Sequence, residues 1–305
     1  MGNTVLELKN VSKFFGKRKV IDNLNLEVQE GEIYGFLGPN GSGKTTTIKM
    51  ILRLLSNDSG EIKVNGYDTK KEFEKAMEFI GAIVENPDLY KYMSGIDNLR
   101  LHARIRNIDE KRIEEVLELV DLKGREKDKV GKYSLGMKQR LGLALTLLHN
   151  PKVLILDEPT NGLDPAGIKK LRDILKEISH KQGVAVFVSS HILTEMQLMC
   201  DKVAVLSNGK IVKVENITDK NIQDKEYIEK VEIRVNEVER AQAIIQEKFE
   251  LKTKIEDNNV VITLPTDRIP QIIKELAIAD VGVKAVIPKE HDLEEIFFNA
   301  TKEEM

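Results

Sequence analysis

Eight consecutive residues near the start of the chain have the spacing of a phosphate-binding loop. The segment GPNGSGKT follows an apolar run and precedes a helical one. Its glycines let backbone amides turn inward around an anion at a helix N-terminus. Lys44 adds a positive charge for the β- and γ-phosphates, and the hydroxyl of Thr45 suits Mg²⁺. A chance match is expected in roughly one chain in a hundred of this size. The segment therefore predicts a nucleotide site, with candidate ligands Gly38, Asn40, Gly41, Ser42, Gly43, Lys44, Thr45 and Thr46.

Two carboxylates end another apolar run, VLILDEP. A strand tip beside a phosphate loop is where α/β sheets present residues to ligands. There, Asp157 can hold Mg²⁺ through water, and Glu158 can orient and deprotonate an attacking water molecule. The alternative is an ordinary acidic turn at the end of a strand.

Two further segments have residue types suited to phosphate. VFVSSH places His191 at the end of an apolar run, where the imidazole is either structural or a contact for the γ-phosphate. YSLGMKQR places Ser134 and Gly136 immediately before a strongly helical run. A hydroxyl group at a helix N-terminus also suits a phosphate, yet this segment lies about 90 residues after the phosphate loop.

The elements that must position these residues follow from hydrophobic periodicity. The first ~30 residues alternate apolar and polar, which predicts antiparallel strands with one solvated face. The runs KVLILDEP and VAVFVSSH are typical of strands buried on both faces of a parallel sheet, joined by a helix that ends at Gly183. The charged region between them and the phosphate loop has helical spacing and predicts a mostly α insertion.

A second, smaller domain is expected after a polar linker at residues 215–228. Residues 229–305 show the order βαββαβ, which suggests a ferredoxin-like α+β module closed by a helix at DLEEIFFNAT. It is interpreted either as a packing or dimer-stabilising appendage or as a regulatory domain. The preceding domain is expected to span residues 3–214, with its helical part at about 86–150.

Composition excludes several classes of protein. The net charge of −3 suggests no basic face for nucleic acid, and no apolar run approaches the ~20 residues that span a bilayer. The single cysteine, Cys200, excludes an intrachain disulfide and lies in an apolar run, which favours a packed thiol over a reactive one. We therefore expect a soluble, cytoplasmic chain.

In this order, GPNGSGKT, YSLGM, VLILDEP and TNGLDP resemble the motifs of the nucleotide-binding subunit of ATP-binding cassette (ABC) transporters, over about residues 3–213. Ser134 and Gly136 match the serine and second glycine of the family's LSGGQ signature, whereas Tyr133 and Leu135 depart from it. Asp164 matches the aspartate of the D-loop. The resemblance implies a P-loop NTPase cassette with a parallel core sheet, an antiparallel β subdomain and a helical insertion.

The resemblance also implies how two phosphate-binding segments serve one reaction. In this family two cassettes pair head to tail, and each signature helix caps the ATP held by the other chain. One cassette per chain then implies a homodimer with ATP and Mg²⁺ as cofactors.

Two more site residues follow from the resemblance alone. Phe15 matches the aromatic residue that stacks on adenine, with Phe14 as the neighbouring candidate and a core phenylalanine as the alternative. Glu85 stands where most relatives have the glutamine of the Q-loop. A carboxylate can ligate Mg²⁺ but cannot donate an amide hydrogen bond.

Together these motifs are similar to those of exporters that confer bacitracin resistance or lantibiotic immunity. The resemblance implies an ATPase that drives a separate membrane permease at the inner face of the cell membrane. The surface expected to contact the permease offers the side chains of Leu89, Tyr90, Tyr92 and Met93. The alternatives are a soluble ABC ATPase that acts on ribosomes or DNA, and a catalytically silent scaffold. The chain has one cassette and no long heptad run, and Lys44, Asp157, Glu158 and His191 are all present.

Overall fold

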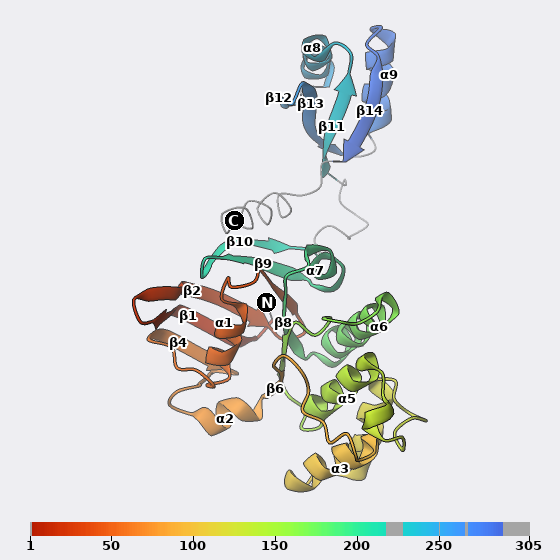
Figure 1. Ribbon diagram of the computed structural model, residues 1–305. Helices are drawn as coiled ribbons and strands as arrows, with labels where there is room; N and C mark the ends of the chain where they lie inside the picture. The colour runs from red at the N-terminus through yellow and green to blue at the C-terminus, as the bar shows by residue number, and fades with distance from the viewer. Residues whose placement is uncertain (1, 218–227, 250, 266–267, 289–305) are drawn as a thin grey trace. The chain divides into compact units, whose positions relative to one another are not determined.

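The computed structural model describes residues 2–217, 228–249, 251–265 and 268–288. The described residues form two compact units, the first ending at residue 217 and the second beginning at residue 228 (Figure 1). Each unit has its own sheet system and its own hydrophobic core.

A six-stranded sheet forms the centre of the first unit, in the order β10-β9-β3-β8-β7-β6. Strands β3, β6, β7, β8 and β9 are parallel to one another, and β10 is the antiparallel edge. Every residue of β3, β7 and β8 is buried, which explains their continuous apolar sequences. The strands are β3 (Ile33–Leu37), β6 (Ile80–Ile83), β7 (Val153–Asp157), β8 (Ala185–Ser190), β9 (Lys202–Ser207) and β10 (Lys210–Asn216).

An antiparallel sheet in the order β2-β1-β4-β5 packs on one side of this core. Its alternating strands bury one face and leave the other in solvent, as the sequence predicts. The strands are β1 (Thr4–Phe15), β2 (Arg18–Gln29), β4 (Ser59–Val64) and β5 (Tyr67–Asp68).

Helices α1, α5 and α7 pack against strands of the core sheet, and α3 and α5 lie together, away from the antiparallel sheet (Figure 1). In α4 the buried residues are Ile113, Val116 and Leu117, the helical spacing seen in the sequence. The helices are α1 (Lys44–Ile51), α2 (Phe73–Glu78), α3 (Gly95–Ile105), α4 (Glu110–Leu119), α5 (Leu135–Leu147), α6 (Pro165–Lys176) and α7 (Leu193–Met199), with a 3₁₀ turn η1 (Val130–Lys132) and a π turn η2 (Glu177–Lys181).

The second unit has the expected element order and an antiparallel sheet in the order β12-β13-β11-β14. Its assignment to the ferredoxin-like class stays a prediction, and the expected closing helix lies outside the described residues. The elements are β11 (Ile228–Val235), α8 (Val238–Phe249), β12 (Thr253–Glu256), β13 (Asn259–Pro265), α9 (Ile269–Ile278) and β14 (Val283–Pro288).

The expected boundary at residue 214 falls inside β10, which continues to Asn216. This edge strand has no fully buried residue, so its alternation of polar and apolar residues resembles a linker in sequence. Most of the expected linker lies outside the described residues.

Aromatic packing at the centre of the core sheet gives a test of its stability. Phe187 of β8 is fully buried, with ring centroids 6.0 Å from Tyr34 and 5.2 Å from Phe36 on β3. We expect Phe187→Ala to lower the free energy of unfolding by about 3–5 kcal/mol, because it removes the ring and leaves a cavity. Phe73→Ala, at a ring that is 48% exposed, is the control and should cost at most about 1 kcal/mol. Urea unfolding followed by circular dichroism measures both, and equal losses would contradict this packing.

Candidate nucleotide-binding site

The phosphate loop lies between the end of β3 and the start of α1. Gly43 is the N-cap of α1 with φ 112°, and a Cβ built there would lie 2.4 Å from Cδ1 of Ile21. Gly41 also has a positive φ, 87°. The backbone conformation therefore favours glycine at position 43, and a Cβ there would also force the end of the Ile21 side chain to move.

Lys44 is 5% exposed and its ammonium group is held inside the loop. Its Nζ donates to the carbonyl oxygens of Gly38 (2.7 Å) and Pro39 (2.9 Å) and lies 3.4 Å from Oε1 of Glu158. The hydroxyl oxygen of Ser42 is buried and has no hydrogen-bond partner within the described part of the chain. A buried cation and an unsatisfied hydroxyl group in one Gly-rich loop suit a phosphate ligand.

Glu158 follows β7 and connects the phosphate loop to the end of β8. Its Oε2 lies 2.6 Å from Nδ1 of His191 and accepts a hydrogen bond from Nδ2 of Asn161 (2.9 Å). Burial raises the pKa of this carboxyl group, but the hydrogen bond with His191, the charge of Lys44 and the amide of Asn161 outweigh it and lower the pKa below its usual value. Glu158 is therefore ionised at neutral pH, as a base for water must be.

Asp157 is the last residue of β7 and is 2% exposed. The hydroxyl of Ser189 donates to its Oδ1 (2.6 Å), and the same hydroxyl oxygen accepts from the backbone N–H of Glu158 (3.0 Å). Ser189 thus fixes both carboxylate residues at the strand tip.

Oxygen donors at this site fit the chemistry of Mg²⁺. Magnesium prefers hard oxygen ligands and usually takes one or two from the protein, with water and phosphate completing the shell. Asp157 and Thr45 offer a carboxylate and a hydroxyl, and no cluster of three or more potential ligand residues occurs in the part of the chain that the structure describes. These two oxygen donors fit a magnesium ion whose remaining ligands come from water and phosphate.

Glu85 follows β6 and its side chain is 69% exposed. Its Oε1 lies 3.7 Å from Nζ of Lys49 on α1. Lys49 and Thr45 are one helical turn apart on α1, so this contact places Glu85 beside the helix that begins at the phosphate loop. The structure gives no hydrogen bond between Glu85 and the other described candidate residues.

Phe14 and Phe15 end β1 and are 43% and 51% exposed, so neither ring belongs to the core. Nζ of Lys13 lies 5.6 Å from the centroid of the Phe15 ring, and Nζ of Lys19 lies at the same distance from that of Phe14. Both rings can offer a face to a flat base, and the geometry does not choose between them.

Ser134 and Asp164 are the N-caps of α5 and α6. Their side-chain oxygens accept from the backbone N–H groups of Met137 (3.2 Å) and Gly167 (3.0 Å), respectively. Both line one open cavity of about 440 Å³, together with Gly136. The N-terminus of α5, with the neutral cap Ser134, favours an anion at this cavity, whereas the carboxylate of Asp164 already caps α6.

The structure thus brings together Lys44, Asp157, Glu158 and His191, and it forms a second group from Ser134, Gly136 and Asp164. Sequence reasoning missed two contacts of the carboxylates, the hydroxyl of Ser189 and the amide of Asn161. A serine within a fully buried apolar strand was the available signal for Ser189. Asn161 looks like an ordinary turn residue and offered none.

Comparisons with known proteins all point to one family. The family described as ABC transporter matches residues 21–161. The uncharacterized ABC transporter ATP-binding protein YhcH of Bacillus subtilis (strain 168) is 47% identical over 302 residues, covering 98% of this chain and 97% of that protein. The bacitracin transport ATP-binding protein BcrA of Bacillus licheniformis is 40% identical over 250 residues, covering 82% and 81%.

A solved structure titled as the dimeric structure of MJ0796, a bacterial ABC transporter cassette, is also similar. It has a TM-score of 0.62 and 26% identity, covering 70% of this chain and 98% of that one. The likeness therefore extends to the fold of the first unit.

The packing of Gly43 against Ile21 predicts the effect of a single methyl group. Gly43→Ala should weaken ATP binding at least about tenfold, because the strained backbone and the contact with Ile21 displace the loop amides. Gly66→Ala is the control, since Gly66 also has a positive φ (84°) but has open space around it. Isothermal titration with ATP measures both variants, and equal affinities would show that the loop tolerates the methyl group.

Proposed function

This chain belongs to the ATP-binding subunit family of ABC transporters and hydrolyses ATP, and from this premise we propose that it powers a separate membrane permease. The observation that carries the catalytic assignment is the carboxylate of Glu158, held between Lys44 and His191. These contacts support roles for Lys44 on the phosphates, for Glu158 as the base and for His191 as the γ-phosphate contact.

In the proposed reaction, the phosphate loop binds the β- and γ-phosphates and Lys44 turns from the loop carbonyls to the phosphate oxygens. His191 leaves Glu158 for the γ-phosphate, which frees Oε2 to accept a proton from the attacking water. The water oxygen bonds to the γ-phosphorus while the bond to the ADP oxygen breaks. Mg²⁺, which Thr45 and Asp157 would hold, neutralises charge on the phosphate oxygens when bound.

A second copy of the chain completes the site in this proposal. Ser134, Gly136 and Asp164 form a group of their own at the N-termini of α5 and α6. The N-terminus of α5 at this open cavity would suit the γ-phosphate of an ATP bound to the other copy. We therefore propose a head-to-tail homodimer in the ATP state.

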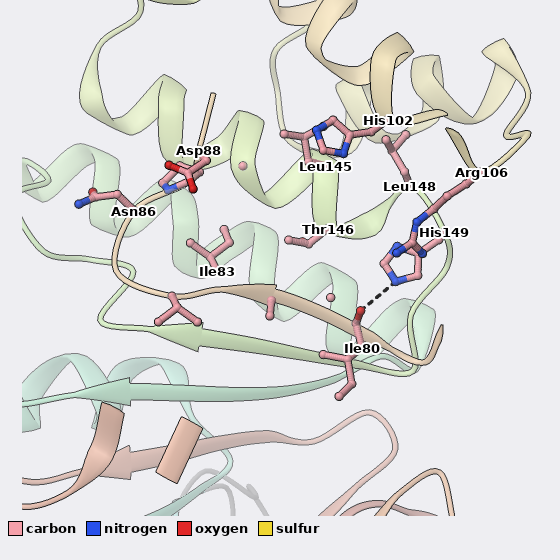
Figure 2. Close-up of a pocket in the computed structure, with 15 residues that line it drawn as sticks. Ile80, Ile83, Asn86, Asp88, His102, Arg106, Leu145, Thr146, Leu148 and His149 are labelled. Atoms are coloured by element: carbon pink, nitrogen blue, oxygen red, sulfur yellow. Dashed lines mark hydrogen bonds between the residues drawn. The ribbon is translucent and has the colours of Figure 1, made fainter. Parts of the chain in front are cut away.

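The permease contact is proposed at a groove between β6 and the helical layer. This groove has a volume of about 410 Å³, and its lining includes the apolar side chains of Ile83, Leu145 and Leu148. Figure 2 shows Asp88 near one end and His102, Arg106 and His149 near the other. A mixed lining of apolar and charged side chains suits a short amphipathic helix.

Arg106 gives this groove a cationic end. It lines two adjoining cavities and forms no ion pair with another residue in the described ranges. Burial, followed by the charge of Arg106, lowers the pKa of both His102 and His149, so both imidazoles are neutral at neutral pH. Arg106 is then the charge that an acidic side chain of the permease would meet.

Tyr90 and Tyr92 extend the proposed contact. They are 43% and 72% exposed, and their rings meet edge to face with centroids 6.0 Å apart. Exposed aromatic pairs of this kind are enriched at protein interfaces.

The substrate class proposed is a peptide antibiotic or another amphipathic compound, which the permease would export. The support is the likeness to the bacitracin transport protein BcrA. Within the described residues, each helix is too short or too polar to cross a membrane. We accordingly propose that the chain lies in the cytoplasm at the inner face of the membrane and is held there by the permease.

The role of Glu158 predicts a separation of binding from turnover. Glu158→Gln should lower the steady-state rate of ATP hydrolysis at least about a hundredfold, because an amide cannot accept the proton from water. ATP should still bind and accumulate the closed dimer. Glu114→Gln, at an exposed position on α4, is the control. Phosphate release and gel filtration with ATP measure the two properties, and full turnover in Glu158→Gln would remove Glu158 as the base.

The proposed permease contact predicts an effect of charge reversal. Arg106→Glu should abolish most co-purification of a polytopic membrane protein from native membranes, while the ATPase rate of the isolated chain stays unchanged. Arg104→Glu is the matched control, because Arg104 is exposed in the last turn of α3, two residues before Arg106 at the C-cap, and does not line the groove. Quantitative mass spectrometry of the gently solubilised complex is the measurement. Absence of a membrane protein with the native chain would contradict the transporter function, whereas equal recovery with both variants would contradict only this contact.

A further inference from the structure

Two side-chain contacts join the loop after β7 to the segment that follows β8. The first is the contact of Glu158 with His191. The second is a hydrogen bond from the hydroxyl of Thr160 to Oε2 of Glu195 on α7, at 2.5 Å. Thr160 follows Glu158 by two residues, and Glu195 follows His191 by four. The two contacts therefore join the two segments at two successive points.

The second contact differs from the first because it involves no residue of the proposed phosphate site. Thr160 is 4% exposed and Glu195 is partly buried, so water competes little for this hydrogen bond. In the proposed reaction His191 turns from Glu158 to the γ-phosphate, which breaks the first contact. The bond between Thr160 and Glu195 can persist through that change.

Helix α7 is closely packed against the strand that leads into the phosphate loop. A Cβ built on Gly35 of β3 would lie 2.8 Å from Sγ of Cys200 and 3.0 Å from Sδ of Met196. The helix therefore cannot shift far from β3 without opening the core. Glu195 offers a fixed point from which the loop at Thr160 can be held.

We propose that Glu195 is a positioning residue for ATP hydrolysis: through Thr160, it holds the loop from Glu158 to Asp164 in place while His191 changes partner. The loop then keeps Glu158 directed at the water and presents Asp164 toward the second copy of the chain. This inference rests on the proposed roles of Glu158 and His191 and adds a residue that touches neither nucleotide nor water.

Paired substitutions of the full-length chain test the hydrogen bond. Glu195→Ala and Thr160→Val each remove one partner, and Thr160→Val does so with little change of shape. Each should lower kcat about tenfold and leave KM for ATP within about twofold, because loss of a hydrogen bond to a charged group misplaces the loop without altering the phosphate contacts. Glu195→Gln and Thr160→Ser keep an acceptor and a donor and should retain most of the activity.

A double-mutant cycle distinguishes positioning from general destabilisation. The variant with both Thr160→Val and Glu195→Ala should be no slower than either single variant, since both remove the same contact. Unchanged kcat in the single variants, or additive losses, would overturn the proposal. So would a failure of Glu195→Gln and Thr160→Ser to retain activity. Turnover persisting in Glu158→Gln would contradict the catalytic roles themselves, so the two failures are distinguishable.

Discussion

The buried charge of Lys44 is the constraint on which the rest of the site depends. An ammonium group that is 5% exposed must have polar partners, and here they are two loop carbonyl oxygens and the carboxylate of Glu158. Those partners require a tight loop, which the left-handed Gly43 makes at the start of α1. They also require the tip of β7 to lie beside that loop. The shape of the loop is thus suited to one buried cation, and the charge of Lys44 adds to the hydrogen bond with His191 in lowering the pKa of Glu158.

In our proposal, the same site is only half of a phosphate cage. The hydroxyl of Ser42 has no hydrogen-bond partner among the residues that the structure describes, while the N-termini of α5 and α6 meet at a separate cavity that contains Ser134 and Asp164. We propose that the two halves belong to different copies of the chain. In our proposal, hydrolysis is limited to a closed dimer because neither half is complete alone.

Some features of the fold and the site could be predicted from the sequence, and others could not. Spacing in GPNGSGKT and the apolar runs before Asp157 and His191 identified residues that the structure brings together, because strand tips of a parallel sheet meet at one edge. Side-chain contacts between separate loops, such as Asn161 with Glu158 or Thr160 with Glu195, leave no periodic signal. The domain boundary was misplaced within β10, because an exposed edge strand and a linker have similar composition. The arrangement of Glu85 beside Lys49 also could not be foreseen, since it depends on where β6 ends relative to α1.

In the proposed dimer, each ATP is held between the phosphate loop of one copy and the N-terminus of α5 of the other. The most direct measurement is ATP-dependent dimerisation of Ser134→Arg in a Glu158→Gln background, by light scattering during gel filtration, with ATP affinity of the monomer determined in parallel. An arginine at this cap should leave monomer affinity within about twofold and abolish the dimer, because its bulk fills the position of the γ-phosphate. Normal dimerisation with unchanged ATP affinity would show that α5 does not cap the nucleotide of the partner.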